Sequence, residues 1–234
     1  MNFKNFIESF PAYAKKMVRP QGKPTNLSFD DTLDYNARIK KARTIEEKIR
    51  TTLAAEVGMV IKTSSANQDK NEGIDGWIVS KDGGKTPCAH IPVQIKIRKN
   101  SSGNDILWET IKPWTQFVNS NFEELGDKAF SGKDMKCKAT YLISIGNNGS
   151  TVRIRKVDEV KTAAKELAQE LVKQYRATGQ NYAKSNMGEA RITVDPSRQA
   201  NFSQFLTTQK VNCFIYPGAL SWKLDLNLKN PIIM

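Results

Sequence analysis

The sequence is poor in the residues that build many common catalytic centres, with 3 cysteines and 1 histidine among 234 residues. Cys88, Cys137 and Cys213 are far apart, so neither a disulfide framework nor a C-x-x-C zinc site is indicated. The single histidine, His90, excludes a multi-histidine metal centre. A Ser/His/Asp triad is disfavoured as well, because no G-x-S-x-G motif is present.

Phosphate-binding loops and long apolar runs are also missing. No G-x-x-x-x-G-K-[ST] motif occurs, and no G-x-G-x-x-G follows an expected strand. No apolar run approaches the length of a transmembrane helix, and Lys4 and Glu8 interrupt the apolar core that a signal peptide requires. We therefore expect an intracellular, cytoplasmic protein without a membrane partner.

Acidic residues are outnumbered: 36 Lys and Arg face 24 Asp and Glu, which gives a formal charge of +12 and a pI near 9.6. Such an imbalance favours a polyanionic partner, either nucleic acid or an anionic membrane surface. No basic amphipathic membrane helix or lipidation signal accompanies the charge, so nucleic acid is the expected partner.

Apolar residues make up 39% of the chain and charged residues 26%, as in an ordinary globular protein, and one domain over residues 1–234 is the default. Periodicity predicts a helix from Asp30 or Asp31 to Val57, stopped by Gly58, and an amphipathic helix over 158–176. Strands are expected over 59–63, 138–145, 151–156, 191–194, 211–216 and 220–228, with a polar loop over 64–70. These elements indicate an α/β fold with helices on both sides of a sheet.

The stretch from Asn71 to Lys99 is predicted to form a β-hairpin. One extended run covers 73–80, a turn-rich connection covers 81–85, and a second run covers 90–97. In the second run the polar Gln94 and Lys96 alternate with aliphatic residues, so they share one face of the strand. A polar face of this kind is also what a solvent-exposed strand surface would show.

Asp75 lies on the preceding strand between Gly73 and Gly76, and these glycines are expected to leave backbone space for a ligand. Ordinary hairpin register would bring Asp75, Gln94 and Lys96 to one spot. A carboxylate and an amide oxygen suit a hard cation such as Mg²⁺, and an adjacent ammonium can orient a water or stabilise charge on phosphorus.

At Ile74-Asp75 and Gln94-Ile95-Lys96 the chain resembles the PD-(D/E)XK nuclease superfamily, whose motif is an acidic residue ending one strand and E-x-K or Q-x-K on the next. GIDGWI followed by VQIK looks most like the catalytic domain of Mrr-type restriction enzymes, and less like archaeal Holliday junction resolvases. Ile74 replaces the usual proline, and Gln94 replaces the usual glutamate and removes a negative charge.

The resemblance implies a restriction-endonuclease-like α/β core with a central mixed sheet flanked by helices. That core would cover residues 44–155, with an N-terminal helical extension over 1–43 and a C-terminal elaboration with extra strands over 177–234. The activity that it implies is Mg²⁺-dependent hydrolysis of DNA phosphodiester bonds, as an endonuclease of restriction or DNA-processing type.

The same resemblance assigns roles to residues. Asp75, Gln94 and the Ile95 carbonyl would bind Mg²⁺, for which Mn²⁺ could substitute, and Lys96 would position or activate the attacking water. A glutamate on the preceding helix often completes such a site. Counting back from the Gly58 stop favours Glu47, whereas spacing to Leu53 favours Glu46, so both stay open, beside the alternative that either is a surface residue paired with a neighbouring base.

Four further residues are expected to hold the DNA backbone: Lys62, Ser64, Arg98 and Lys99. A homodimer is plausible, because cutting a duplex commonly needs two copies of one site. Two alternatives stay open. One is a non-catalytic DNA- or RNA-binding protein with a degenerate nuclease core. The other is an unrelated basic fold with a chance D…Q-x-K, which predicts that Asp75 and Lys96 lie far apart.

Overall fold

A computed structural model describes residues 35–79, 90–96, 105–111, 126–145, 149–193 and 210–232. Several expectations fall outside these residues: the extension before residue 35, the turn at 81–85, and the phosphate contacts assigned to Arg98 and Lys99.

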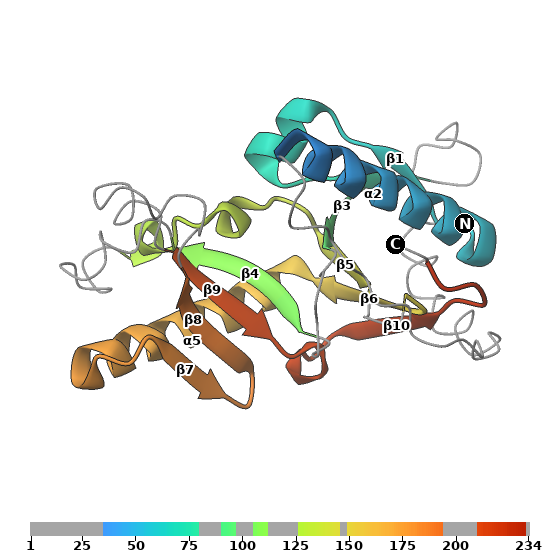
Figure 1. Cartoon of the computed structure of the whole chain (residues 1–234). Coiled ribbons are helices and arrows are strands. Elements are labelled where there is room, and N and C mark those ends of the chain that lie inside the picture. Colours follow the sequence, from blue (N-terminus) through green and yellow to red (C-terminus); the bar gives the residue numbers. More distant parts are fainter. Residues whose placement is uncertain are drawn as a thin grey trace.

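The described chain forms two sheets, two long helices and several short helical turns (Figure 1). The first sheet contains β1 (Val60–Thr63), β2 (Gly76–Val79), β3 (Ile91–Lys96), β5 (Tyr141–Ile145), β6 (Thr151–Lys156) and β10 (Lys223–Asn227). The second contains β4 (Ile106–Ile111), β7 (Tyr182–Ser185), β8 (Gly188–Thr193) and β9 (Lys210–Ile215). The helical elements are α2 (Tyr35–Val57), η1 (Gln68–Glu72), η2 (Gly126–Ala129), η3 (Lys133–Lys136), α5 (Val157–Thr178) and η5 (Pro217–Ala219).

The six-stranded sheet is mixed and runs in the order β1-β2-β3-β5-β6-β10. Strands β1, β2 and β3 form an antiparallel meander, β5 then pairs parallel to β3, and β6 and β10 add antiparallel strands. A parallel pair needs a crossover connection, and here the chain between β3 and β5 contributes β4 to the second sheet. The predicted α/β fold with a mixed sheet is confirmed at this level.

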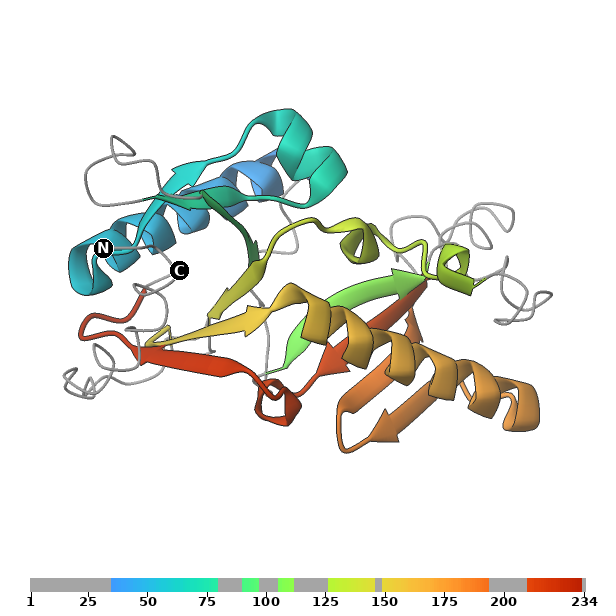
Figure 2. The same ribbon diagram turned by 180° about the vertical axis from the view of Figure 1, so that it is seen from behind.

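The second sheet is wholly antiparallel, in the order β4-β9-β8-β7, and α5 packs along it. Figure 2, seen from behind, shows α5 crossing in front of this sheet. None of the helices in the described residues is long and apolar enough to cross a membrane.

Two hydrophobic clusters lie on the two faces of the six-stranded sheet. One joins α2 to aliphatic residues of every strand in that sheet, among them Val93 and Ile95 of β3. The other joins α5 and the four-stranded sheet to Leu142 of β5, and Trp108 of β4 is fully buried in it. The pleat of β3 therefore turns Gln94 away from α2 and toward the second cluster.

Helix α2 forms as its sequence pattern predicts. Ile45, Ile49, Leu53 and Val57 recur every four residues and are all buried against the sheet. The helix ends at Gly58, whose φ of 68° is the left-handed conformation typical of a residue that terminates a helix.

Several elements differ from expectation. The loop predicted over 64–70 contains the start of η1, which closes on Gly73 in a left-handed conformation with its N–H donating to the Gln68 carbonyl. Strand β2 begins at Gly76 instead of residue 73, because Gly73, Ile74 and Asp75 follow η1 as irregular chain. Strand β7 was not expected, since a short edge strand with mostly exposed side chains lacks an apolar alternation.

The glycines around Asp75 make room for protein atoms. A Cβ at Gly76 would lie 2.6 Å from the Ile61 Cγ2 and 2.8 Å from the Lys62 carbonyl oxygen, and one at Gly73 would lie 3.2 Å from Cys137. The expected backbone space for a ligand is therefore occupied, at Gly76 by β1 and at Gly73 by the segment after η3.

We expect Gly76→Ala to destabilise the protein by about 1 to 3 kcal/mol, because the added methyl group overlaps a backbone carbonyl that cannot move without disturbing the β1–β2 ladder. Urea unfolding measures this change. Gly218→Ala is the matched control, since nothing lies within 4 Å of a Cβ at that position. Equal midpoints for the two variants would contradict the close packing of β1 on β2.

Candidate functional site

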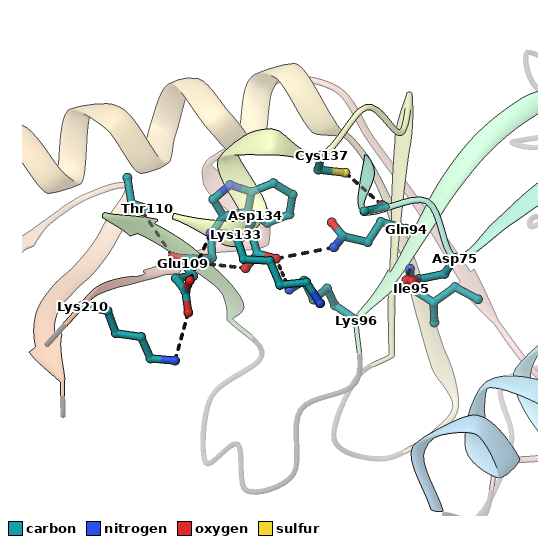
Figure 3. A network of polar contacts seen from close by, with 12 residues as sticks. Asp75, Gln94, Ile95, Lys96, Glu109, Thr110, Lys133, Asp134, Cys137 and Lys210 are labelled. Carbon is teal, nitrogen blue, oxygen red and sulfur yellow. Dashed lines mark hydrogen bonds and ion pairs between the residues drawn. The ribbon is translucent and has the colours of Figure 1, made fainter. Parts of the chain in front are cut away.

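Asp75 lies where β2 and β3 begin to separate. Its backbone N–H donates to the Val93 carbonyl at 2.9 Å, and its Oδ2 accepts a 2.6 Å hydrogen bond from the Ile95 N–H (Figure 3). The carboxylate is thus held by the backbone of the strand that carries the Q-x-K motif. Ile95 contacts Asp75 through its N–H, and metal binding by the Ile95 carbonyl stays a prediction.

The environment of Asp75 opposes its ionisation. Burial raises its pKa to about 7, and the Ile95 N–H works against this shift. The negative charges of Glu46 and Asp69 raise the pKa further, whereas the ammonium of Lys96 lowers it. Negative charge accumulates around this carboxylate, and a bound cation would relieve the resulting repulsion.

Of the two candidate glutamates on α2, Glu46 is the one whose negative charge raises the pKa of Asp75. The Glu46 side chain is 26% exposed, and its pKa is raised chiefly by burial, with Asp69 adding to the shift and Arg50 opposing it. Glu47 is 67% exposed and pairs with Arg50 at 3.0 Å on the helix surface. Arg50 also lies 3.9 Å from a carboxylate oxygen of Glu46, so both glutamates pair with this base, and Glu47 is the more exposed of the two.

Gln94 and Lys96 share one face of β3, as the period of two predicts, and both side chains extend toward Asp134 (Figure 3). Lys96 Nζ donates to Asp134 Oδ1 at 2.6 Å, and Gln94 Nε2 approaches the same oxygen at 3.5 Å. Asp134 is 4% exposed and Gln94 5% exposed, so this contact is largely shielded from water.

One atom of the Gln94 amide has no partner: its Oε1 is buried and accepts no hydrogen bond from any described residue. An ionised carboxylate accepts hydrogen bonds but donates none. Asp134 therefore faces the NH₂ of the Gln94 amide and supplies no hydrogen bond to the Gln94 Oε1. A buried oxygen without a partner is unfavourable, so a water molecule or an ion bound to it would be stabilising.

Asp134 also connects the site to the second sheet. Its Oδ2 accepts a 2.8 Å hydrogen bond from the Glu109 N–H of β4. The Glu109 side chain in turn accepts from the Lys133 N–H and from Lys210 Nζ of β9, each at 3.0 Å. The Lys96 ammonium lies 5.6 Å from the centre of the Trp108 ring, a cation–π distance.

The predicted residues thus fall into two neighbouring groups. Asp75 interacts with Glu46 and Asp69, while Gln94 and Lys96 meet on Asp134. Lys96 is close enough to Asp75 to lower the pKa of that carboxyl. The Lys96 ammonium pairs with Asp134, and a joint action of Asp75 and Lys96 on one metal ion stays a prediction.

A scan against protein-family models, a search of curated proteins and a search of solved structures each found no significant match to this chain. What the site can do follows from its own residues.

Two site residues were not predicted from the sequence. The sequence pattern predicts a polar loop at Asp69. In the structure Asp69 belongs to the helical turn η1, from which its charge acts on Asp75. Asp134 lies between lysines in Lys133-Asp134-Met135-Lys136, where the surrounding charge indicates an exposed turn, yet it is one of the few buried charged side chains in the described chain. No local pattern marks either residue.

The two expected phosphate-binding residues inside the described chain lie on β1 and directly after it. Lys62 is exposed on β1, which pairs with β2, and the Ser64 N–H donates to the Asp75 carbonyl at 3.4 Å. Their contacts with phosphate stay predictions.

The donor set suits a hard cation. Among the described residues no three His, Cys, Asp or Glu side chains are grouped as a metal site. One group offers the carboxylates of Asp75 and Glu46 and the other the amide oxygen of Gln94, and Mg²⁺ and Mn²⁺ prefer oxygen ligands of this kind. The residues present fit such an ion.

Asp75→Asn should make metal-free protein more stable at pH 8 than the parent. The folded-state pKa near 7 exceeds the ordinary value of 3.8, so the folded state retains a proton that the unfolded chain releases. The parent therefore loses stability as pH rises between these values, and the loss persists above them. The substituted amide keeps an oxygen acceptor for the Ile95 N–H but carries no charge.

We expect the stability difference between variant and parent to grow by about 2 kcal/mol from pH 5 to pH 8, as measured by urea unfolding in EDTA. Glu170→Gln, an exposed position on α5, is the control and should leave the pH dependence unchanged. A constant difference across this range would show that Asp75 ionises normally.

Proposed function

We propose that this protein is a metal-dependent nuclease that hydrolyses phosphodiester bonds in DNA. The observation that carries the proposal is the state of Asp75: a mostly buried carboxylate beside the strand that carries Q-x-K, with a pKa raised by burial and by the charges of Glu46 and Asp69. Strongly perturbed carboxylates with a specific set of charged neighbours are typical of catalytic and metal sites.

In this proposal Asp75, Glu46 and the Oε1 of Gln94 hold Mg²⁺ or Mn²⁺. When bound, the ion supplies Lewis-acid stabilisation of the negative charge that develops on the scissile phosphate and the leaving oxygen. The support for Gln94 is its buried oxygen without a partner among the described residues. The support for Glu46 is its partial burial and its electrostatic contact with Asp75.

Lys96 positions or activates the attacking water. Its side chain is 28% exposed, and the Asp134 carboxylate fixes the position of its ammonium. The net charge of +12 would attract the DNA backbone, and Lys62, Ser64, Arg98 and Lys99 would contact phosphates. Each such phosphate contact releases counterions, so binding should weaken steeply as salt increases.

A second candidate is a nucleic-acid-binding protein whose nuclease core has lost its activity. The observation that favours it is the engagement of Lys96 and the Gln94 NH₂ by Asp134, which neutralises the lysine charge in the described structure. This candidate predicts salt-dependent binding of DNA or RNA without Mg²⁺-dependent cleavage.

The test of the proposal is cleavage of plasmid, linear duplex and single-stranded DNA with Mg²⁺ or EDTA. Asp75→Ala and Lys96→Ala should each lower the rate at least about 100-fold, because one removes a metal ligand and the other the group that acts on the water. Lys173→Ala, on the exposed face of α5, is the control and should cleave at the parental rate.

Equal nicking by the parent and the two site variants would discard the assigned site. Tight, salt-sensitive binding without cleavage in Mg²⁺ or Mn²⁺ would favour the second candidate.

The choice between the two glutamates has its own test. Glu46→Gln should raise the Mg²⁺ concentration for half-maximal cleavage about 10-fold or more, because it removes a charge beside Asp75. Glu47→Gln removes the same charge one residue away, on the exposed face of α2, and should leave that concentration unchanged. The reverse result would assign the ligand to Glu47.

A further inference from the structure

Gln94 leaves the proposed cation site without the negative charge that a glutamate would supply at the same position. A buried carboxylate nevertheless lies against it. Asp134, 40 residues further along the chain, places its Oδ1 3.5 Å from Gln94 Nε2 and 2.6 Å from Lys96 Nζ. Both Asp134 and Gln94 are more than nine-tenths buried.

We propose that Asp134 is a positioning residue of this site, which carries the negative charge missing from position 94 and determines which atom of the Gln94 amide is left for a divalent cation. This inference rests on the proposed function, because it concerns the same cation site.

The orientation of the amide follows from hydrogen-bonding chemistry. A carboxylate has no proton to donate, so only the NH₂ of Gln94 can face Asp134. The Oε1 is then directed elsewhere, and it is the buried atom without a partner among the described residues. A buried amide oxygen without a hydrogen-bond partner can bind a hard cation. Binding would offset the unfavourable free energy of burying that oxygen unpaired.

The Asp134 carboxylate is itself prevented from turning. Its Oδ2 accepts the Glu109 N–H at 2.8 Å, which leaves Oδ1 directed at Gln94 and Lys96. Across positions 94, 96 and 134 the formal charges are zero, plus one and minus one. A glutamate at position 94 with an asparagine at position 134 would give the same total charge. The two pairs differ only in which of the two positions carries the negative charge.

This exchange can be made experimentally. Asp134→Asn keeps an oxygen for the Glu109 N–H but presents an NH₂, which would donate to Gln94 Oε1 and occupy the ligand atom. Gln94→Glu combined with Asp134→Asn reverses the pair. The new amide at position 134 then donates to one oxygen of the new carboxylate at position 94, and the other oxygen is available to the cation. In the double variant the carboxylate introduced at position 94 lies on the same face of β3 as Lys96 and can pair with it.

The measurement is Mn²⁺ binding to metal-free protein by isothermal titration calorimetry, with urea unfolding to confirm that each variant is folded. Asp134→Asn should raise the dissociation constant at least about 10-fold. The double variant should return it to within about threefold of the parent, which corresponds to a strong non-additive coupling of the two substitutions. Glu170→Gln is the control for loss of a distant carboxylate.

A purely structural role for Asp134 would make the double variant bind Mn²⁺ as weakly as Asp134→Asn alone, and that result would overturn the inference. Parental affinity in folded Asp134→Asn would overturn it as well. Either result leaves the proposed function standing if the parent binds Mn²⁺ and cleaves DNA. A parent that binds no Mn²⁺ would remove both proposals together.

Discussion

The buried carboxylate of Asp134 is the contact on which the arrangement of this protein depends. It joins Lys96 of the six-stranded sheet to the backbone of β4 in the four-stranded sheet, and Glu109 extends the connection to Lys210 of β9. A buried charge is tolerated only where its oxygens are fully paired. Here Oδ1 and Oδ2 both have charged or backbone partners, so the relative position of the two sheets and the position of Lys96 are linked through one group.

Asp75 and the Gln94 oxygen, in contrast to Asp134, are not fully stabilised by their surroundings. Asp75 is held by the Ile95 N–H, but burial and the charges of Glu46 and Asp69 disfavour its ionised form, and the Gln94 oxygen lacks a partner among the described residues. Proteins rarely retain such unfavourable groups in a core that serves stability alone. The burial of Asp75 and the unpaired Gln94 oxygen on the adjacent strand are what give the proposed cation site its physical basis.

Much of the architecture could be predicted from local patterns. The stripe of Ile45, Ile49, Leu53 and Val57 predicts α2, and the alternation in β3 predicts that Gln94 and Lys96 share a face. These predictions succeed because helix and strand periods are properties of consecutive residues. The short β7 and the helical turn η1 escaped prediction, since neither has an apolar period long enough to detect.

The sequence by itself determined the basic charge, the mixed α/β character and the candidates Asp75, Gln94 and Lys96. Tertiary structure alone decided that the charge of Glu46 acts on Asp75 and that β1 and Cys137 fill the space beside Gly76 and Gly73. It also decided that Asp134 meets Gln94 and Lys96. The physical reason is sequence separation. Asp134 is 38 residues from Lys96, and no local period reports which distant side chains the packing of two sheets will bring into contact.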